Sequence, residues 1–144
     1  MFYSCAIIYN PETKSVLLHL RDDKAPVNPN RWGLFGGGEE PGERPIQTLI
    51  RELKEELDWD VRPEQIVPVR DYENHGHATH RYIFTILSRA ETSSFTLNEG
   101  ADLKWVSLDK VFDYDLTEKA AADLNYFIEH LEKSDLMIED VKMN

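Results

Sequence analysis

The chain has 144 residues, 41% of them hydrophobic, which is the size and composition of one domain with a substantial core. It carries 27 acidic and 16 basic residues, and the net charge of −11 argues against a long nucleic acid as a partner, because no excess of cations is available to neutralise its phosphates. No apolar run reaches the roughly 18 residues of a membrane-spanning helix and no signal peptide is evident, so we expect one cytoplasmic domain over residues 1–144 with no membrane partner.

The first third of the chain predicts strands and a glycine-rich turn. Residues 2–9 and 15–20 are apolar and β-prone, and the Asn10-Pro11 turn signal between them predicts a hairpin or two neighbouring strands of a sheet. The polar, proline-containing segment 21–30 predicts a loop. Residues 32–35 then predict a short extended piece that leads into Gly36, Gly37 and Gly38.

A helix is predicted from residues 44–45 to residues 57–58, because proline is favoured in the first helical turn and the segment has helical periodicity. Its apolar stripe comprises Ile46, Leu49, Ile50, Leu53 and Leu57. Glu52, Glu55 and Glu56 form an adjacent stripe, and carboxylates at this spacing repel one another by roughly a few tenths of a kcal/mol per pair. A solvated acidic face would have the same spacing. Beside an apolar face and behind a glycine-rich turn, however, the cluster indicates a bound divalent cation and, through it, phosphate chemistry.

Further strands are predicted over residues 66–72, 81–87 and 103–106, and a second amphipathic helix over residues 116–133, followed by a charged tail from Ser134. His75, His77 and His80 lie in the turn region between two of these strands. Their spacing is not specific for zinc, so we interpret them as solvated turn residues, one of which can donate a hydrogen bond to a substrate.

The segment from Gly37 to Trp59 reads GGEEPGERPIQTLIRELKEELDW. It resembles the Nudix box, Gly-x5-Glu-x7-Arg-Glu-U-x-Glu-Glu-x-Gly-U, where U is a bulky apolar residue. The six fixed residues that match are Gly37, Glu43, Arg51, Glu52, Glu55 and Glu56, and Leu53 and Trp59 fill the two apolar positions. The flanking sequences WGLFGGG and EGADLKW also resemble the family, so the resemblance extends over most of the chain. Asp58 replaces the usual glycine. In the family, that glycine ends the helix in a left-handed conformation. Aspartate tolerates this conformation better than most residues. Phe35 replaces a usual proline.

The resemblance implies an α/β/α sandwich with a mixed β-sheet between helices. It also implies Mg²⁺-dependent hydrolysis of the phosphoanhydride of a nucleoside diphosphate linked to another group, with Mn²⁺ as the alternative ion. Glu52, Glu55, Glu56 and the backbone carbonyl of Gly37 would be the metal ligands. Glu43 and Arg51 would hold the loop and the helix together and orient Glu52. Glu99 is the candidate for a further glutamate, as general base or extra ligand; the alternative is an exposed loop acid.

Three further residues are candidates for substrate binding. Trp32 and Phe35 flank the glycines and could stack on a base or sugar, although core packing is the alternative. Arg21 and Lys24 lie in a predicted loop and could bind distal phosphates of the substrate. The alternative is that this loop is only solvated. The partner is therefore expected to be a small nucleoside diphosphate derivative, with nucleoside triphosphates or nucleotide sugars favoured over ADP-ribose and dinucleoside polyphosphates.

Two other functional classes are compatible with this fold. A nucleotide-binding regulatory module of the same fold typically lacks the metal-binding glutamates, all of which this chain retains. An isoprenoid diphosphate isomerase would be longer and would carry a cysteine near its active site, whereas Cys5 lies in an N-terminal strand. Many relatives are homodimers, but no feature of the sequence requires a dimer.

Overall fold

The computed structural model describes residues 1–74 and 78–132. Within this part of the chain, seven strands form one sheet: β1 (Phe2–Asn10), β2 (Ser15–Leu20), β3 (Trp32–Gly33), β4 (Phe35–Gly38), β5 (Val67–Asn74), β6 (Thr79–Leu87) and β7 (Asp102–Ser107). Two α-helices, α1 (Pro45–Leu57) and α2 (Glu118–Glu132), accompany it, together with single 3-10 turns at Pro63–Gln65, Thr92–Ser94 and Val111–Asp113. No helix in the described ranges is long and apolar enough to cross a membrane.

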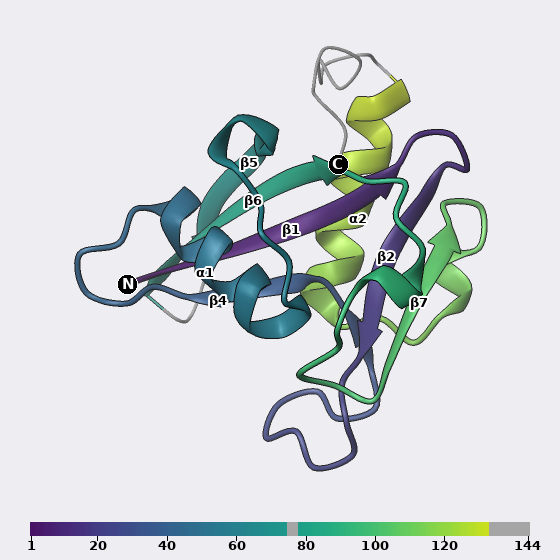
Figure 1. The fold of residues 1–144 in the computed structure, drawn as a ribbon, viewed down its shortest axis with the longest axis horizontal. Coiled ribbons are helices and arrows are strands. Elements are labelled where there is room, and N and C mark those ends of the chain that lie inside the picture. The colour runs from purple at the N-terminus through teal and green to yellow at the C-terminus, as the bar shows by residue number, and fades with distance from the viewer. Residues whose placement is uncertain (75–77, 133–144) are drawn as a thin grey trace.

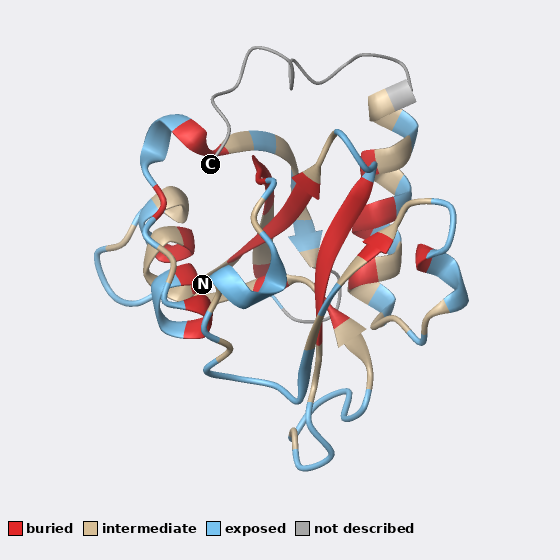
Figure 2. Cartoon of the chain, turned by 45° about the vertical axis from the view of Figure 1, so that its right-hand side comes forward, coloured by how far each residue is buried: buried red, intermediate tan, exposed pale blue. Residues whose placement is uncertain are grey.

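Strand β1 organises the sheet because three strands pair with it. β6 runs parallel to β1 along its whole length, from the Phe2–His80 pair to the Tyr9–Leu87 pair. β2 joins β1 as a hairpin only at their shared turn and then diverges to pair with β7 and β3. The space left beside the first half of β1 is taken by β4, which pairs antiparallel to it. The sheet is therefore mixed, and its central strands are the most buried part of the chain (Figures 1 and 2).

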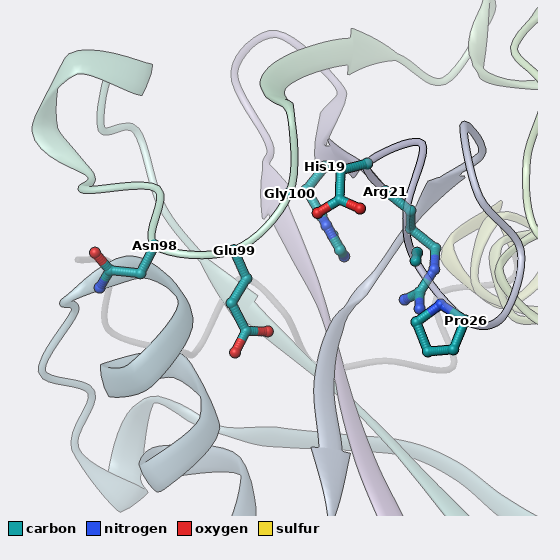
Figure 3. A pocket seen from close by; sticks show the side chains of 8 residues that line it. His19, Arg21, Pro26, Asn98, Glu99 and Gly100 are labelled. Atoms are coloured by element: carbon teal, nitrogen blue, oxygen red, sulfur yellow. The ribbon is translucent and has the colours of Figure 1, made fainter.

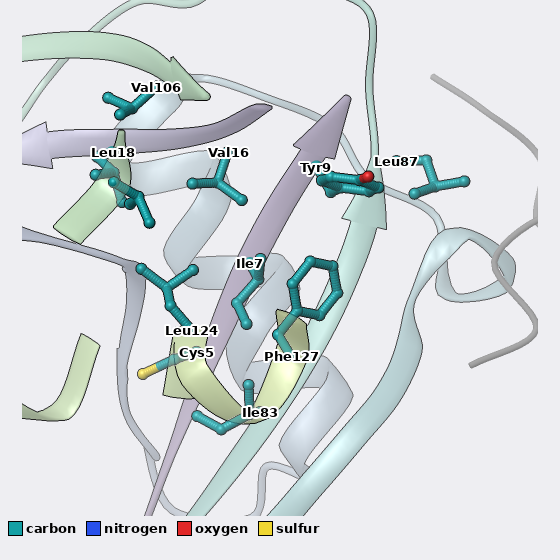
Figure 4. Close-up of a cluster of buried hydrophobic side chains, with 11 residues drawn as sticks. Cys5, Ile7, Tyr9, Val16, Leu18, Ile83, Leu87, Val106, Leu124 and Phe127 are labelled. Carbon is teal, nitrogen blue, oxygen red and sulfur yellow. The ribbon is translucent and has the colours of Figure 1, made fainter. Parts of the chain in front are cut away.

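The two helices cover opposite faces of this sheet (Figure 1). Side chains alternate between the faces of a strand, and in β1 Cys5, Ile7 and Tyr9 pack toward α2 while Ala6 and Ile8 pack toward α1. Figure 4 shows the first of these clusters, to which α2 contributes Leu124 and Phe127. The second cluster receives Leu49, Leu53 and Leu57 from α1, which are all fully buried. The predicted α/β/α sandwich is confirmed.

Several expected boundaries differ from the structure. Gly36, Gly37 and Gly38 are not a turn but most of strand β4. Helix α2 begins at Glu118 rather than residue 116, because Thr117 caps it by accepting a hydrogen bond from the backbone N–H of Ala120 at 3.2 Å. His80 lies in β6 rather than in a turn.

The imidazole of His80 is bound by carboxylates on both sides: Nε2 lies 2.7 Å from Oδ1 of Asp71 and Nδ1 lies 2.8 Å from Oε1 of Glu73. It is therefore a strand residue that is paired with two carboxylates and remains partly exposed to solvent. His75, His77 and the tail from Ser134 lie outside the described residues.

Candidate metal and active site

Strand β4 and helix α1 meet at a contact that only glycines allow. Gly36 has φ of +139° and lies so close to β1 that a β-carbon would overlap the backbone of Ser4. At the next position, a β-carbon on Gly37 would overlap the carboxylate of Glu52. The absence of a side chain at Gly37 thus lets the first glutamate of the acidic stripe lie directly on the backbone of β4.

Glu56 lies one turn further along α1, and its side chain is directed into the same contact. The residue is only 4% exposed, and its Oε1 accepts a hydrogen bond of 2.9 Å from the backbone N–H of Gly36. Burial raises the pKa of Glu56 to about 8; the hydrogen bond from Gly36 opposes the shift, and the charges of Glu52, Glu99 and Glu55 add to it. A carboxylate in this position therefore needs a nearby positive charge to be ionised at neutral pH.

Arg51 links the helix to the loop that precedes it. Its guanidinium group donates two hydrogen bonds to Glu43, from Nε at 2.8 Å and from one terminal nitrogen at 3.0 Å, which is the bidentate geometry of a strong pair. The same group donates to the carbonyl of Gly38 at 2.9 Å, to Glu52 at 3.0 Å and to Glu55 at 3.3 Å. The hydrogen bonds from Arg51 lower the pKa of Glu43 to about 2. Arg51 therefore fixes where β4 and the glutamates of α1 lie relative to one another.

Glu99 approaches the acidic stripe from a different part of the chain. Its neighbour Asn98 bonds to the C-terminal turn of α1, donating from its backbone to the carbonyl of Glu56 at 2.9 Å and from its side chain to that of Glu55 at 3.0 Å. The charge of Glu99 contributes to the raised pKa values of both Glu52 and Glu56. The structure thus brings together four carboxylates that the sequence separates by up to 47 residues (99 minus 52).

The end of α1 shows how Asp58 substitutes for glycine. Asp58 has φ of +52° and ψ of +39°, which is the left-handed conformation. Its backbone N–H donates to the carbonyl of Lys54 at 3.0 Å, and its carboxylate lies 2.9 Å from Nζ of the same lysine. The expectation that aspartate accepts the conformation of the usual glycine is confirmed.

The donor set fits a hard divalent cation. Residues 1–74 and 78–132 contain no preformed cluster of three His, Cys, Asp or Glu side chains arranged around one point, and Glu52 and Glu55 are bonded to Arg51 instead. Mg²⁺ does not require such a cage, because it binds through one or two carboxylates and retains waters and substrate phosphates. Burial of Glu56, combined with the mutual repulsion of its neighbours, is the electrostatic environment that a cation relieves.

The three residues predicted to bind substrate lie in three different environments. Phe35 has no exposed surface and packs against α1 in the core, so the expectation that its ring stacks on a substrate is wrong for this structure. Trp32 is half-buried and makes an edge-to-face contact with Tyr114, with ring centroids 5.5 Å apart. Arg21 lines a cavity of about 390 Å³ together with Glu99, and its Nε donates to the carbonyl of Val27 at 2.8 Å.

His19 lines the same cavity (Figure 3) and was not among the site residues predicted from sequence. It is a polar residue in the mostly apolar strand sequence SVLLHL, and it follows Leu17 on the face that is directed toward α1. A polar side chain within a mostly apolar strand is the signal that could have drawn attention to it.

Comparison with known proteins agrees with this architecture. A family model described as NUDIX domain matches residues 3–131. The chain is 33% identical over 123 residues to the nucleoside triphosphatase NudI of Escherichia fergusonii, an alignment that covers 78% of this chain and 85% of that protein.

Solved structures share the fold at low sequence identity. The MutT protein from Methanosarcina mazei Go1 is 23% identical with a TM-score of 0.70, over 93% of this chain and 94% of that one. The NUDIX domain of Shewanella oneidensis NrtR, solved in complex with ADP ribose, is 22% identical with a TM-score of 0.73, over 91% and 88% of the two chains.

The chain therefore belongs to the NUDIX domain family. Within that family it is a pyrophosphohydrolase, an enzyme that hydrolyses phosphoric anhydrides, and enzymes of this family generally use divalent metal ions.

Proposed function

We propose that the protein is a Mg²⁺-dependent hydrolase of a nucleoside diphosphate linked to another group, with nucleoside triphosphates and nucleotide sugars as the favoured substrates. The observation that carries this proposal is the buried carboxylate of Glu56, which lies beside Glu52 and Glu99 with its pKa raised to about 8. The relative that is a nucleoside triphosphatase supports triphosphates in particular.

Glu52, Glu55 and Glu56 would hold the metal, together with the backbone carbonyl of Gly37. A divalent cation bound there supplies charge neutralisation for the phosphate oxygens and acidifies a bound water. Arg51 keeps the carboxylate of Glu52 against β4, because it bonds to Glu52 and to the carbonyl of Gly38 at once.

Glu99 is the candidate general base. It is exposed, it lines the cavity next to the acidic stripe, and the loop that carries it is bonded to the end of α1 by Asn98. A carboxylate in this position can accept a proton from an attacking water and release it to solvent.

The test is a panel of compounds incubated with Mg²⁺, with auxiliary phosphatases added so that every product releases phosphate. The panel contains nucleoside triphosphates, canonical and oxidised, nucleotide sugars, ADP-ribose and dinucleoside polyphosphates. We expect a strong signal from one class that disappears in Glu56→Gln and when the metal is chelated. Nucleotide binding without hydrolysis of any compound would instead favour a regulatory module.

A further inference from the structure

Ser4, in the central strand β1, carries a buried hydroxyl group without a hydrogen-bond partner. The residue has no exposed surface, and its Oγ is bonded to no other group within residues 1–74 and 78–132. Nearly all buried polar atoms in folded proteins are paired. Because bulk solvent does not reach this hydroxyl, its partner has to come from a neighbouring group of the protein.

The side chain of Ser4 lies on the face of the sheet that α1 covers. Side chains alternate along a strand, and Ala6 and Ile8, two and four residues further along β1, belong to the hydrophobic cluster beneath α1. On this face, the neighbours of Ser4 along β1 are Phe2 and Ala6, and neither has a polar side chain. A side-chain acceptor must therefore come from an adjoining strand or from α1.

The pairing of β1 with β4 places Glu52 of α1 next to Ser4. Ser4 is directly opposite Gly37 in the antiparallel ladder, and residues paired in this way direct their β-carbons to the same face, about 4.5–5.5 Å apart. Gly37 has no β-carbon, and the carboxylate of Glu52 occupies the position that one would take. The cross-strand neighbour of the Ser4 side chain is thus a carboxylate that the proposed function assigns to the metal.

The hydroxyl of Ser4 and the carboxylate of Glu52 are complementary groups that are not bonded in this structure. Oε1 of Glu52 accepts a hydrogen bond of 3.0 Å from Arg51. A carboxylate has two oxygens with about four acceptor positions, so it can accept from Arg51 and from a serine hydroxyl and still bind an ion. Carboxylates that bind metals are generally held by hydrogen bonds of this kind.

We propose that Ser4 is a positioning residue of the metal site, whose hydroxyl donates a hydrogen bond to the carboxylate of Glu52 when that carboxylate binds a divalent cation. This inference rests on the proposed function, which assigns Glu52 to the metal. In the metal-free protein the hydroxyl remains unpaired, and it gains its partner only when the carboxylate turns toward the ion. Ser4 therefore destabilises the metal-free fold and increases its affinity for the ion.

The variant Ser4→Ala should consequently have two effects of opposite sign. In metal-free buffer it removes a buried hydroxyl that has no partner, so the urea midpoint of unfolding should rise. Its affinity for a divalent ion should fall by about tenfold, since losing a group that orients a metal ligand typically weakens metal binding by about 10- to 100-fold. A serine that only fills space in the core would change the stability and leave the affinity unaltered.

Thr79, at the start of β6, offers a control for the loss of a buried hydroxyl. Its Oγ1 is also buried and has no hydrogen-bond partner in the described part of the chain. Thr79 alternates with Arg81 and Ile83 on the opposite face of the sheet, where Arg81 bonds to Asp123 of α2. Thr79→Val removes the hydroxyl and keeps the shape of the side chain. It should raise the urea midpoint as Ser4→Ala does, and its affinity for the ion should equal that of wild type.

The affinity is measured without nucleotide, by titration with Mn²⁺ followed by electron paramagnetic resonance, and the stability by urea unfolding with a chelator and with Mg²⁺. An equal dissociation constant for Mn²⁺ in Ser4→Ala and wild type overturns the proposal, and so does an equal loss of affinity in Ser4→Ala and Thr79→Val. Failure of the proposed function has a different signature. Wild type would then bind no Mn²⁺, which overturns both proposals, or it would bind Mn²⁺ and hydrolyse no compound, in which case the comparison of dissociation constants still decides the role of Ser4.

Discussion

The carboxylate of Glu52 lies where a side chain on Gly37 would have to be. The two residues are 15 positions apart (52 minus 37) and belong to different elements, and their contact depends on the absence of a β-carbon in strand β4. Arg51 stabilises this contact, since it donates hydrogen bonds to Glu52 at 3.0 Å and to the carbonyl of Gly38 at 2.9 Å.

Substitution of Gly37 with alanine should therefore displace Glu52. Gly37 does not have a positive φ, so its backbone tolerates a side chain, and the expected cost in the free energy of unfolding is about 1–3 kcal/mol for local overpacking. Activity should fall by about 100-fold, because the displaced carboxylate can no longer bind the metal from its original position. Gly38→Ala is the matched control, since the nearest atoms to a β-carbon there belong to the side chains of Met1 and Tyr3 at 3.0 Å or more. Equal activity of the two variants would contradict the role given to this contact.

Glu56→Gln should lower catalytic activity without lowering the stability of the fold. The amide keeps an oxygen that can accept the hydrogen bond from Gly36. It also avoids the cost of burying Glu56, because without a cation this residue must take up a proton on folding at neutral pH. In metal-free buffer, the variant should be at least as stable as wild type toward urea, whereas Mg²⁺-dependent turnover should fall by about 100-fold or more. Activity near that of wild type would show that Glu56 is not a metal ligand.

Arg51→Lys should keep the positive charge but lose the planar set of hydrogen-bond donors that the guanidinium group provides. Lysine cannot donate to Glu43 in bidentate fashion while also reaching Glu52 and the carbonyl of Gly38. We expect kcat to fall by about 10- to 100-fold. Glu43→Gln should act through the same contact, so the double variant should lose no more than the worse single variant. Fully additive losses in a double-mutant cycle would show that the two residues act independently.

The acidic helix was the part of this site that could be predicted from sequence. Helical periodicity over a long segment is a strong local signal, and α1 was expected from residues 44–45 to 57–58 and is found at Pro45–Leu57. The three glutamates of its acidic stripe therefore had known relative positions before any tertiary contact was considered.

The partners of this helix could not be predicted in the same way, because they depend on pairing between distant strands. Glycine has a low strand propensity, and β4 exists because it fills the space beside β1 that β2 leaves free. The register that pairs Phe35 with Ala6 buries the Phe35 ring, which is why its expected contact with substrate is not found. His19 was missed for a related reason, since the face on which a strand residue lies becomes known only with the sheet.

Asp58 offers a test of backbone strain at the end of α1. Its φ of +52° is free of strain only for glycine. Asp58→Gly should leave the free energy of unfolding within about 0.5 kcal/mol of wild type, because relief of strain offsets loss of the exposed pair with Lys54. Asp58→Ala should lower it by about 1 kcal/mol, since alanine gains no compensating contact. Both variants should retain activity, and equal stability of glycine and alanine at this position would argue against a strained C-cap.

His80 should make the stability of the protein depend on pH above 6.5. Hydrogen bonds to Glu73 and Asp71 raise its pKa above the value of 6.5 that an unfolded chain would have. The folded protein therefore holds this proton more tightly than the unfolded chain, and the stabilisation is fully present below pH 6.5 and is lost as the pH rises through the folded pKa. The free energy of unfolding, measured with urea below and well above pH 6.5, should fall more in wild type than in His80→Gln. Comparing the two proteins at both pH values cancels the other titrating groups. Asp71→Asn and Glu73→Gln should each reduce the same difference, and an identical fall in wild type and His80→Gln would show that the imidazole does not contribute.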